Sequence, residues 1–144
     1  MIKVLVIDDD FMVAKVHAGF VNSEPGFTVV GVAHSAGDAI KAAGALSPDL
    51  ILLDIHLPDM NGLDLLQRLR EVQPELDVLV ISAAREMDTV RRALRGGIVH
   101  YLMKPFSRDD LRERLEHYAK AYQPLGEAAD QELQQADVNM LFGL

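Results

Sequence analysis

Polar and charged side chains stand directly after four of the five short, largely apolar segments of the chain. They are Asp8 and Asp9 after residues 4–7, Asp54 after residues 50–53, Ser82 after residues 76–81, and Lys104 after residues 98–103. If the segments are parallel strands, their carboxyl ends share one edge of a sheet, where open α/β sheets carry out their chemistry. Three carboxylates in one cleft repel each other, so they have raised pKa values or require a cation. Mg²⁺ suits such a site, since it takes one or two carboxylates together with waters and phosphate oxygens.

The remaining two groups complete a set that suits a transferred phosphoryl group. The metal and the Lys104 ammonium would neutralise its charge, Ser82 would donate a hydrogen bond to an oxygen, and Asp54 would be the nucleophile. The product would be an aspartyl phosphate. Taken singly, each residue has a plain structural role, such as a helix cap or a turn aspartate. Because the residues after four separate segments all suit one phosphoryl-transfer site, we favour the chemical interpretation over the structural one.

The order of segments predicts the fold that brings these groups together. Apolar segments at residues 4–7, 27–32, 50–53, 76–81 and 98–103 alternate with five helical patterns. Connections of this length require parallel strands, right-handed crossovers and helices on both faces of the sheet. We expect an α/β domain with a flavodoxin-like, doubly wound, five-stranded parallel sheet of order 2-1-3-4-5 and five helices. The segment at residues 27–32 lies at the rim and contributes no obvious site residue.

Local signals set the expected helix ends and buried faces. Asp10 and Ser35 are predicted N-caps, and Gly96-Gly97 fits a C-terminal cap. The first helix is expected to bury an apolar face made of Val13, Val16, Phe20 and Val21. The last helix, starting at Ser107, is expected to bury Leu111, Leu115, Tyr118 and Tyr122.

Composition sets the protein class. The chain has 144 residues, 49% of them hydrophobic, which suits one domain with a short appendage. There are no cysteines, and no apolar run reaches the roughly 18 residues of a membrane span. We therefore expect a cytoplasmic protein with no membrane partner. The net charge of -8 makes this chain a poor binder of nucleic acid by itself.

The tail differs in character from the rest of the chain. Residues 123–144 contain four acidic residues and no Lys or Arg. Residues 128–141 have a helical pattern, with Leu133, Ala136, Met140 and Leu141 roughly on one face. A helix of about 14 residues is marginal alone, so the segment is either a frayed end or a linker. We expect a domain at residues 1–122 and an acidic linker at 123–144 that leads to an absent C-terminal output domain.

Four motifs together resemble the receiver domain of two-component response regulators, over residues 1–122. They are Ile7-Asp8-Asp9, Leu53-Asp54-Ile55-His56-Leu57-Pro58-Asp59-Met60-Asn61-Gly62, Ile81-Ser82-Ala83 and Tyr101-Leu102-Met103-Lys104-Pro105-Phe106. The resemblance implies that a sensor histidine kinase phosphorylates Asp54. It also implies that Asp9 binds Mg²⁺ directly, with Asp8 close by or acting through water, and that the His56 backbone carbonyl is a further ligand.

The resemblance assigns roles to the remaining residues as well. Ser82 and Tyr101 would move together as a switch, and Lys104 would pair with the phosphate. The Lys104–Pro105 peptide bond is expected to be cis. The protein would phosphorylate and dephosphorylate itself without being an enzyme that turns over an external substrate.

Two segments resemble, more narrowly, receivers of the citrate/C4-dicarboxylate-responsive type, which carry a C-terminal helix-turn-helix domain. They are Asp8-Asp9-Asp10-Phe11-Met12-Val13-Ala14 and His100-Tyr101-Leu102-Met103-Lys104-Pro105-Phe106. DNA would then be bound only through a domain outside this chain. The resemblance also implies a homodimer through the fourth helix, fifth strand and fifth helix. There, the arginines of a basic fourth-helix region could pair with Asp109, Asp110 or Glu113 across a two-fold axis; they are Arg85, Arg91, Arg92 and Arg95.

Three other functions fit parts of the pattern. A Mg²⁺-dependent phosphatase of the haloacid-dehalogenase type would use Asp8 and Asp10, but leaves Asp54 unexplained. A flavin carrier on the same fold would place its phosphate against three repelling carboxylates. A pseudo-receiver that never takes a phosphoryl group would not need Asp54 and Lys104. The five histidines show no clustered spacing for a transition metal.

Overall fold

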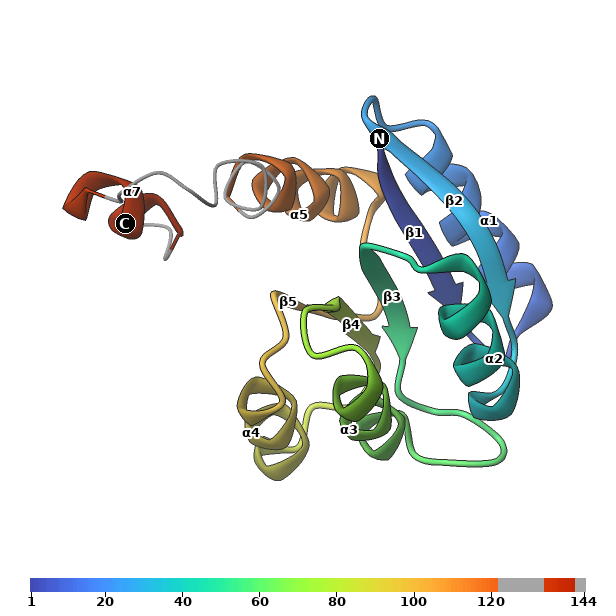
Figure 1. The fold of residues 1–144 in the computed structure, drawn as a ribbon. Helices are drawn as coiled ribbons and strands as arrows, with labels where there is room; N and C mark the ends of the chain where they lie inside the picture. Colours follow the sequence, from blue (N-terminus) through green and yellow to red (C-terminus); the bar gives the residue numbers. More distant parts are fainter. Residues whose placement is uncertain (122–133, 142–144) are drawn as a thin grey trace.

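Five parallel strands alternate with five helices in a computed structural model that describes residues 1–121 and 134–141 (Figure 1). The strands are β1 (Ile2–Ile7), β2 (Phe27–Ala33), β3 (Leu50–Asp54), β4 (Asp77–Ser82) and β5 (His100–Met103). The helices are α1 (Phe11–Asn22), α2 (Ala36–Leu46), α3 (Gly62–Val72), α4 (Met87–Arg95) and α5 (Arg108–Ala121), with α7 (Gln135–Leu141) in the tail. The sheet order is β2-β1-β3-β4-β5, which confirms the expected topology.

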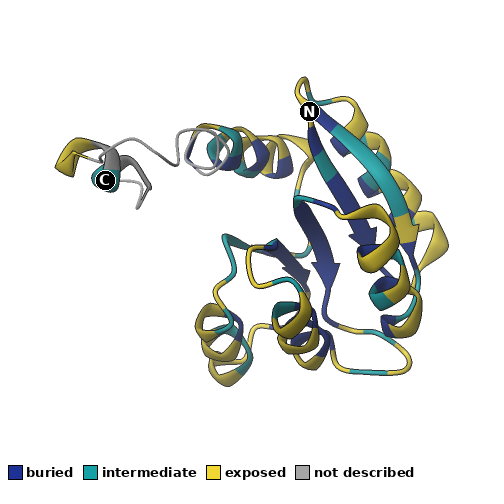
Figure 2. Ribbon diagram, viewed as in Figure 1, coloured by how far each residue is buried: buried dark blue, intermediate teal, exposed yellow. Residues whose placement is uncertain are grey.

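The central strands are buried on both faces, as their unbroken apolar runs predict (Figure 2). Successive side chains of a strand point to opposite faces, so each strand contributes to two cores. Val4 and Val6 pack in one core with residues of α1 and α5. Leu5 and Ile7 pack in the other with residues of α2, α3 and α4. The sheet is therefore covered by helices on both faces.

The expected buried face of α1 is partly confirmed: Val21 is buried and Phe20 packs against the core, but the centre of the buried face lies about one residue further along the helix. Ala14, His17 and Val21 are the buried residues of this helix, whereas the Val16 side chain is 47% exposed. Residues 14, 17 and 21 recur at helical spacing and face the sheet. The sequence pattern favoured valine over alanine and histidine as core residues. Ala14 and Val21, both 0% exposed, lie on this face.

Most local signals are confirmed. Asp10 caps α1 by accepting the N–H groups of Met12 and Val13, and Ser35 caps α2 by accepting that of Asp38. Gly96 is the C-cap of α4, and Gly97, the next residue, has a φ of 76°, which suits a glycine just past a helix end. Leu111, Leu115 and Tyr118 of α5 are buried as expected. The predicted Tyr122 contact, and residues 128–133 of the predicted tail helix, lie outside the described residues.

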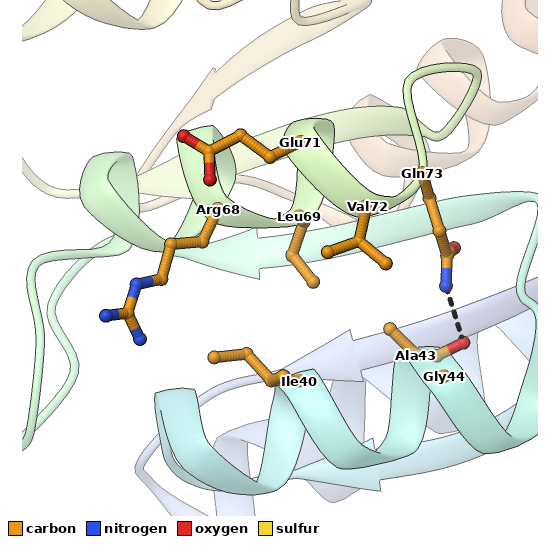
Figure 3. A pocket seen from close by; sticks show the side chains of 8 residues that line it. All are labelled: Ile40, Ala43, Gly44, Arg68, Leu69, Glu71, Val72 and Gln73. Carbon is orange, nitrogen blue, oxygen red and sulfur yellow. Dashed lines mark hydrogen bonds between the residues drawn. The ribbon is translucent and has the colours of Figure 1, made fainter.

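A pocket of about 290 Å³ lies between α2 and α3 (Figure 3). Its apolar lining includes Ile40 and Leu69, and the Gln73 amide donates to the Ala43 carbonyl at 2.9 Å beside it. Its lining contains none of the predicted site residues. Over the described ranges, no helix has both the length and the apolar character needed to cross a membrane.

Candidate functional site

Four strands deliver the predicted side chains to one edge of the sheet. Asp54 and Ser82 are the last residues of β3 and β4, while Asp8 follows β1 and Lys104 follows β5. Asp8, Asp54 and Ser82 are buried, with exposed fractions of 2%, 6% and 0%. The register of the parallel strands thus places groups from four distant parts of the chain around one cleft.

Three carboxylates lie together at the centre of this edge. Oxygens of Asp8, Asp9 and Asp54 are all within 4.8 Å of one another. Asp8 Oδ1 accepts the Asp10 backbone N–H at 3.0 Å, but Asp8 Oδ2 is buried without a hydrogen-bond partner. Burial, reinforced by the nearby Asp54 charge, raises the pKa of Asp8 from an ordinary 3.8 to about 6. An unpartnered buried oxygen beside two further carboxylates fits a hard divalent cation such as Mg²⁺.

Lys104 supplies the positive charge at the same edge. Its Nζ lies 2.8 Å from Asp54 Oδ2 and 3.7 Å from Asp8 Oδ2. Burial alone would lower the pKa of the Lys104 ammonium, but its hydrogen bond to Asp54 and the two carboxylate charges outweigh burial and raise it. Lys104 therefore remains charged and holds one oxygen of Asp54. The other oxygen, Oδ1, accepts the His56 backbone N–H at 2.9 Å.

Ser82 and Tyr101 are both bonded to one residue, Ala84, in the loop between β4 and α4. The Ala84 N–H donates to Ser82 Oγ at 2.9 Å, and the Tyr101 hydroxyl donates to the Ala84 carbonyl at 2.9 Å. Ser82 Oγ is therefore engaged with its own loop. Ser82 and Tyr101 are thus linked through a single intervening residue.

The loop after Asp54 is closed by its own backbone. The Gly62 N–H donates to the Ile55 carbonyl at 2.8 Å, and His56 forms an antiparallel bridge with Asn61. A Cβ on Gly62 would lie 2.4 Å from Ile55 Cα, so only glycine allows this approach. The loop exposes the His56 side chain while its backbone stays beside Asp54. The Lys104–Pro105 peptide bond is cis, as expected.

Sequence reasoning missed what β2 contributes to the site. The His34 ring, directly after β2, has Nδ1 2.9 Å from the Asp8 carbonyl oxygen. The rim strand therefore does contact the edge where the acids meet, contrary to the expectation. A histidine at the end of a strand was the available signal.

An apolar groove adjoins the Lys104 side of the site. It has a volume of about 680 Å³ and is lined by α1 and the β5–α5 loop, with Met12, Val16 and Phe106 among its residues. His17, buried at its base, has a pKa lowered to about 4 by burial and by the Lys104 charge. The groove brings exposed apolar surface next to a charged site.

Two histidines and one arginine make contacts that the sequence did not predict. His100 Nε2 lies 3.0 Å from His117 Nδ1, although 17 residues separate them. Among residues 1–121 and 134–141, the only group of three or more possible metal ligands is the aspartate trio already described. Arg92 of α4 pairs with Asp64 of α3 in the same chain. One basic residue of the predicted dimer face thus has a partner within the chain.

Fold and site together define a flavodoxin-like domain with an acidic, magnesium-type cleft at the carboxyl edge of its sheet. The chain belongs to the response regulator receiver domain family, whose model matches residues 4–116. It is thus a receiver domain of the kind found in two-component response regulators. Receiver domains bind Mg²⁺ at an acidic pocket and work with sensor histidine kinases, and Asp8, Asp9 and Asp54 form an acidic cluster in this chain.

The curated relatives that the chain matches include transcriptional regulatory proteins. The chain is 42% identical over 127 residues to the transcriptional regulatory protein CitT of Halalkalibacterium halodurans, covering 87% of this chain and 55% of that protein. It is 43% identical over 117 residues to the transcriptional regulatory protein DcuR of Escherichia coli K12, covering 80% of this chain and 49% of that protein. The chain thus spans about half the length of the curated relatives it matches.

Solved structures share the fold. A receiver domain protein from Methanospirillum hungatei superimposes with a TM-score of 0.79 at 24% identity, covering 86% of this chain and 98% of that one. A CheX–CheY complex with beryllofluoride and magnesium from Borrelia burgdorferi gives a TM-score of 0.73 at 28% identity, covering 79% of this chain and 86% of that chain.

Proposed function

We propose that Asp54 accepts a phosphoryl group from a phosphohistidine of a sensor kinase, and that the phosphorylated domain controls a DNA-binding output. The observation that carries this proposal is the cleft in which Lys104 Nζ lies 2.8 Å from Asp54 Oδ2, while the buried Asp8 Oδ2, 3.7 Å from the same ammonium, has no hydrogen-bond partner. An ion pair between Lys104 and Asp54 with a purely structural role would not require a second buried carboxylate, that of Asp8, with an oxygen that lacks a hydrogen bond. The cleft has the composition that phosphoryl transfer needs.

Each residue of the cleft would have its own role in phosphoryl transfer. The carboxylates of Asp8, Asp9 and Asp54, with the His56 carbonyl, would hold Mg²⁺, which neutralises phosphoryl oxygen charge when bound. An Asp54 oxygen attacks phosphorus, and the P–N bond of the phosphohistidine breaks with its electron pair going to the imidazole. Lys104 then pairs with a phosphoryl oxygen in place of Asp54 Oδ2. Asp54 itself is 6% exposed, which limits the access of water that would compete with it for the phosphoryl group.

The signal leaves the site through Ser82. Its hydroxyl turns from the Ala84 N–H to a phosphoryl oxygen, and Tyr101, bonded to the same loop residue, changes position with it. Shifting a two-state ratio from 1:99 to 99:1 requires roughly 5.5 kcal/mol of differential stabilisation. New bonds from Lys104, Ser82 and a metal to one phosphoryl group are of the right order. The surface of α4, β5 and α5 changes and forms a homodimer.

The output lies beyond the receiver. The match covers only 55% and 49% of the length of the two relatives, which are named transcriptional regulatory proteins. Residues 123–144 would then be an acidic linker to a C-terminal helix-turn-helix domain that binds DNA, in a cytoplasmic regulator of the citrate/C4-dicarboxylate type. This assignment is a proposal from similarity, supported by the acidic composition of the tail.

Intact-protein mass spectrometry after incubation with acetyl phosphate and Mg²⁺ tests the phosphoacceptor. The expected result is a gain of one phosphoryl group, lost in Asp54→Asn and strongly reduced by EDTA. The matched control is Asp64→Asn, an exposed aspartate on α3. A gain that survives Asp54→Asn would refute the assignment. Sustained hydrolysis of phosphate monoesters would favour the haloacid-dehalogenase alternative.

Sedimentation with and without beryllofluoride tests the dimer. The expected result is a larger dimer fraction with beryllofluoride and Mg²⁺ present, at several protein concentrations. An unchanged mass at every concentration would contradict the proposed switching surface while leaving the phosphoacceptor assignment intact.

A further inference from the structure

Both backbone groups of Asp8 are held by the end of β2. The Asp8 N–H donates to the Ala33 carbonyl at 3.0 Å, and His34 Nδ1 lies 2.9 Å from the Asp8 carbonyl. Because a carbonyl oxygen can only accept, Nδ1 carries the proton in this contact. The Phe11 ring stacks on the His34 ring with centroids 3.7 Å apart. The histidine is thereby fixed over the loop that carries the acid pair.

The same short segment also holds the loop after Asp54. The Asp59 carboxylate accepts the backbone N–H groups of Ala36 at 2.8 Å and Gly37 at 3.0 Å, at the start of α2. These two hydrogen bonds lower the pKa of the Asp59 carboxyl. Asp59 thus caps a helix from which it is separated by more than 20 residues in the chain. Ser35 already caps this helix locally by accepting the Asp38 N–H, so the helix has a second cap in Asp59.

We propose that residues 33–37 form a brace between the two metal-binding loops, and that His34 and Asp59 are positioning residues for the Mg²⁺ site. His34 fixes the loop that presents Asp8, and Asp59 fixes the loop that presents the His56 carbonyl. This inference rests on the proposed function insofar as it takes those groups as metal ligands. Neither positioning residue touches the reacting atoms.

The geometry demanded by Mg²⁺ explains why a brace matters. The ion requires near-octahedral coordination at about 2.0–2.1 Å, so small shifts between its ligands are costly. Its ligands here come from separate loops, after β1 and after β3. Each loop is bonded to the same five residues, which limits their relative movement. Loss of a partner that orients a ligand typically lowers metal affinity by about 10–100-fold for direct second-shell contacts.

The test measures the initial rate of Asp54 phosphorylation by acetyl phosphate against Mg²⁺ concentration, with the 144-residue chain. His34→Phe keeps a ring against Phe11 but removes the N–H, and Asp59→Ala removes both acceptors. Each is expected to raise the half-saturating Mg²⁺ concentration by about 3–10-fold, at the lower end of second-shell effects. The rate at saturating Mg²⁺ is expected to stay within about twofold, because Asp54 and Lys104 are unchanged.

Conservative variants and a matched control separate positioning from general damage. His34→Asn places an amide N–H near the position of Nδ1, and Asp59→Asn keeps one acceptor, so both are expected to recover part of the Mg²⁺ affinity. Asp38→Ala removes another exposed acidic side chain from the first turn of α2, and is expected to leave Mg²⁺ dependence unchanged. An equal shift in Asp38→Ala would assign the effect to net charge and overturn the brace.

The double variant tests whether both residues act through one segment. If they do, His34→Phe combined with Asp59→Ala gives a smaller shift than the product of the single shifts. A fully multiplicative effect would overturn a shared brace, and unchanged Mg²⁺ dependence in both single variants would overturn the positioning roles.

A second readout keeps this inference separate from the proposed function. Titration of the unphosphorylated chain with Mg²⁺, followed by the NMR shifts of the Asp8 and His56 amides, needs no phosphoryl transfer. If the wild-type chain takes no phosphoryl group, the proposed function fails, and a weakened NMR midpoint in the variants still supports the brace. Equal midpoints overturn it, and a wild-type chain that does not respond to Mg²⁺ overturns both.

Discussion

Replacing Asp8 by asparagine should stabilise the metal-free protein. Asp8 is 2% exposed, lies beside Asp54, and has one oxygen without a hydrogen-bond partner. Ionising the Asp8 carboxyl therefore costs more free energy in the folded state than in the unfolded chain, where it is surrounded by water. Asparagine has nearly the same shape, can still accept the Asp10 N–H, and carries no charge. Asp8 would thus be kept for binding a cation at the expense of stability.

The size and sign of the effect follow from the pKa. Folding raises the pKa of Asp8 from an ordinary 3.8 to about 6. The folded state then binds the proton more tightly, so the free energy of unfolding falls as pH rises from 3.8 to about 6, and the loss is complete above that range. At about 1.4 kcal/mol for each pH unit, the full difference is roughly 3 kcal/mol. Since Asp54 shares the ionisation of this cleft, we expect about 1–3 kcal/mol in practice.

Urea unfolding followed by far-UV circular dichroism, in EDTA, measures this difference. Asp8→Asn should be more stable than the wild type at pH 8, and the gain should disappear near pH 4. Added Mg²⁺ should stabilise the wild type more than the variant. Asp38→Asn, which removes an exposed charge, is the control and should change little. Equal or lower stability of Asp8→Asn at pH 8 without metal would refute the reasoning.

Two further predictions concern the elements that surround the site. Gly62→Ala should lower the free energy of unfolding by about 1–3 kcal/mol, since its Cβ would meet the Ile55 backbone at 2.4 Å; urea unfolding checks this, and an unchanged midpoint would contradict the close approach. Arg70→Met should loosen the C-terminal end of α4, because Arg70 donates to the carbonyls of Gly96 at 3.2 Å and Gly97 at 2.7 Å. Faster amide hydrogen exchange around residues 96–98 is the expected result, and unchanged exchange would argue against this tether.

The sequence alone determined the architecture and the set of groups at the sheet edge. Short apolar runs bounded by turn signals indicate buried parallel strands, because a strand that is covered by helices on both faces needs apolar side chains at every position. Chemistry-bearing residues at the ends of those runs must then share an edge, which is how Asp54 and Lys104 could be paired from 50 residues apart. Caps such as Asp10 were predictable because they depend on a few neighbouring residues.

The tertiary structure decided which of several permitted contacts form. Helical spacing allowed more than one buried face for α1, and packing against the sheet selected Ala14 and His17 over Val16. The 3.0 Å contact of His100 with His117 joins a strand to a helix whose relative placement no local pattern specifies.

The detailed contacts in the cleft also depend on tertiary packing. Local preferences depend on dihedral angles and on periodic burial, which adjacent residues determine. Which oxygen of Asp8 lacks a partner, and how His34 and Asp59 reach the two loops, depends on the register and packing of segments distant in the chain. Those positions are fixed only when the whole core closes.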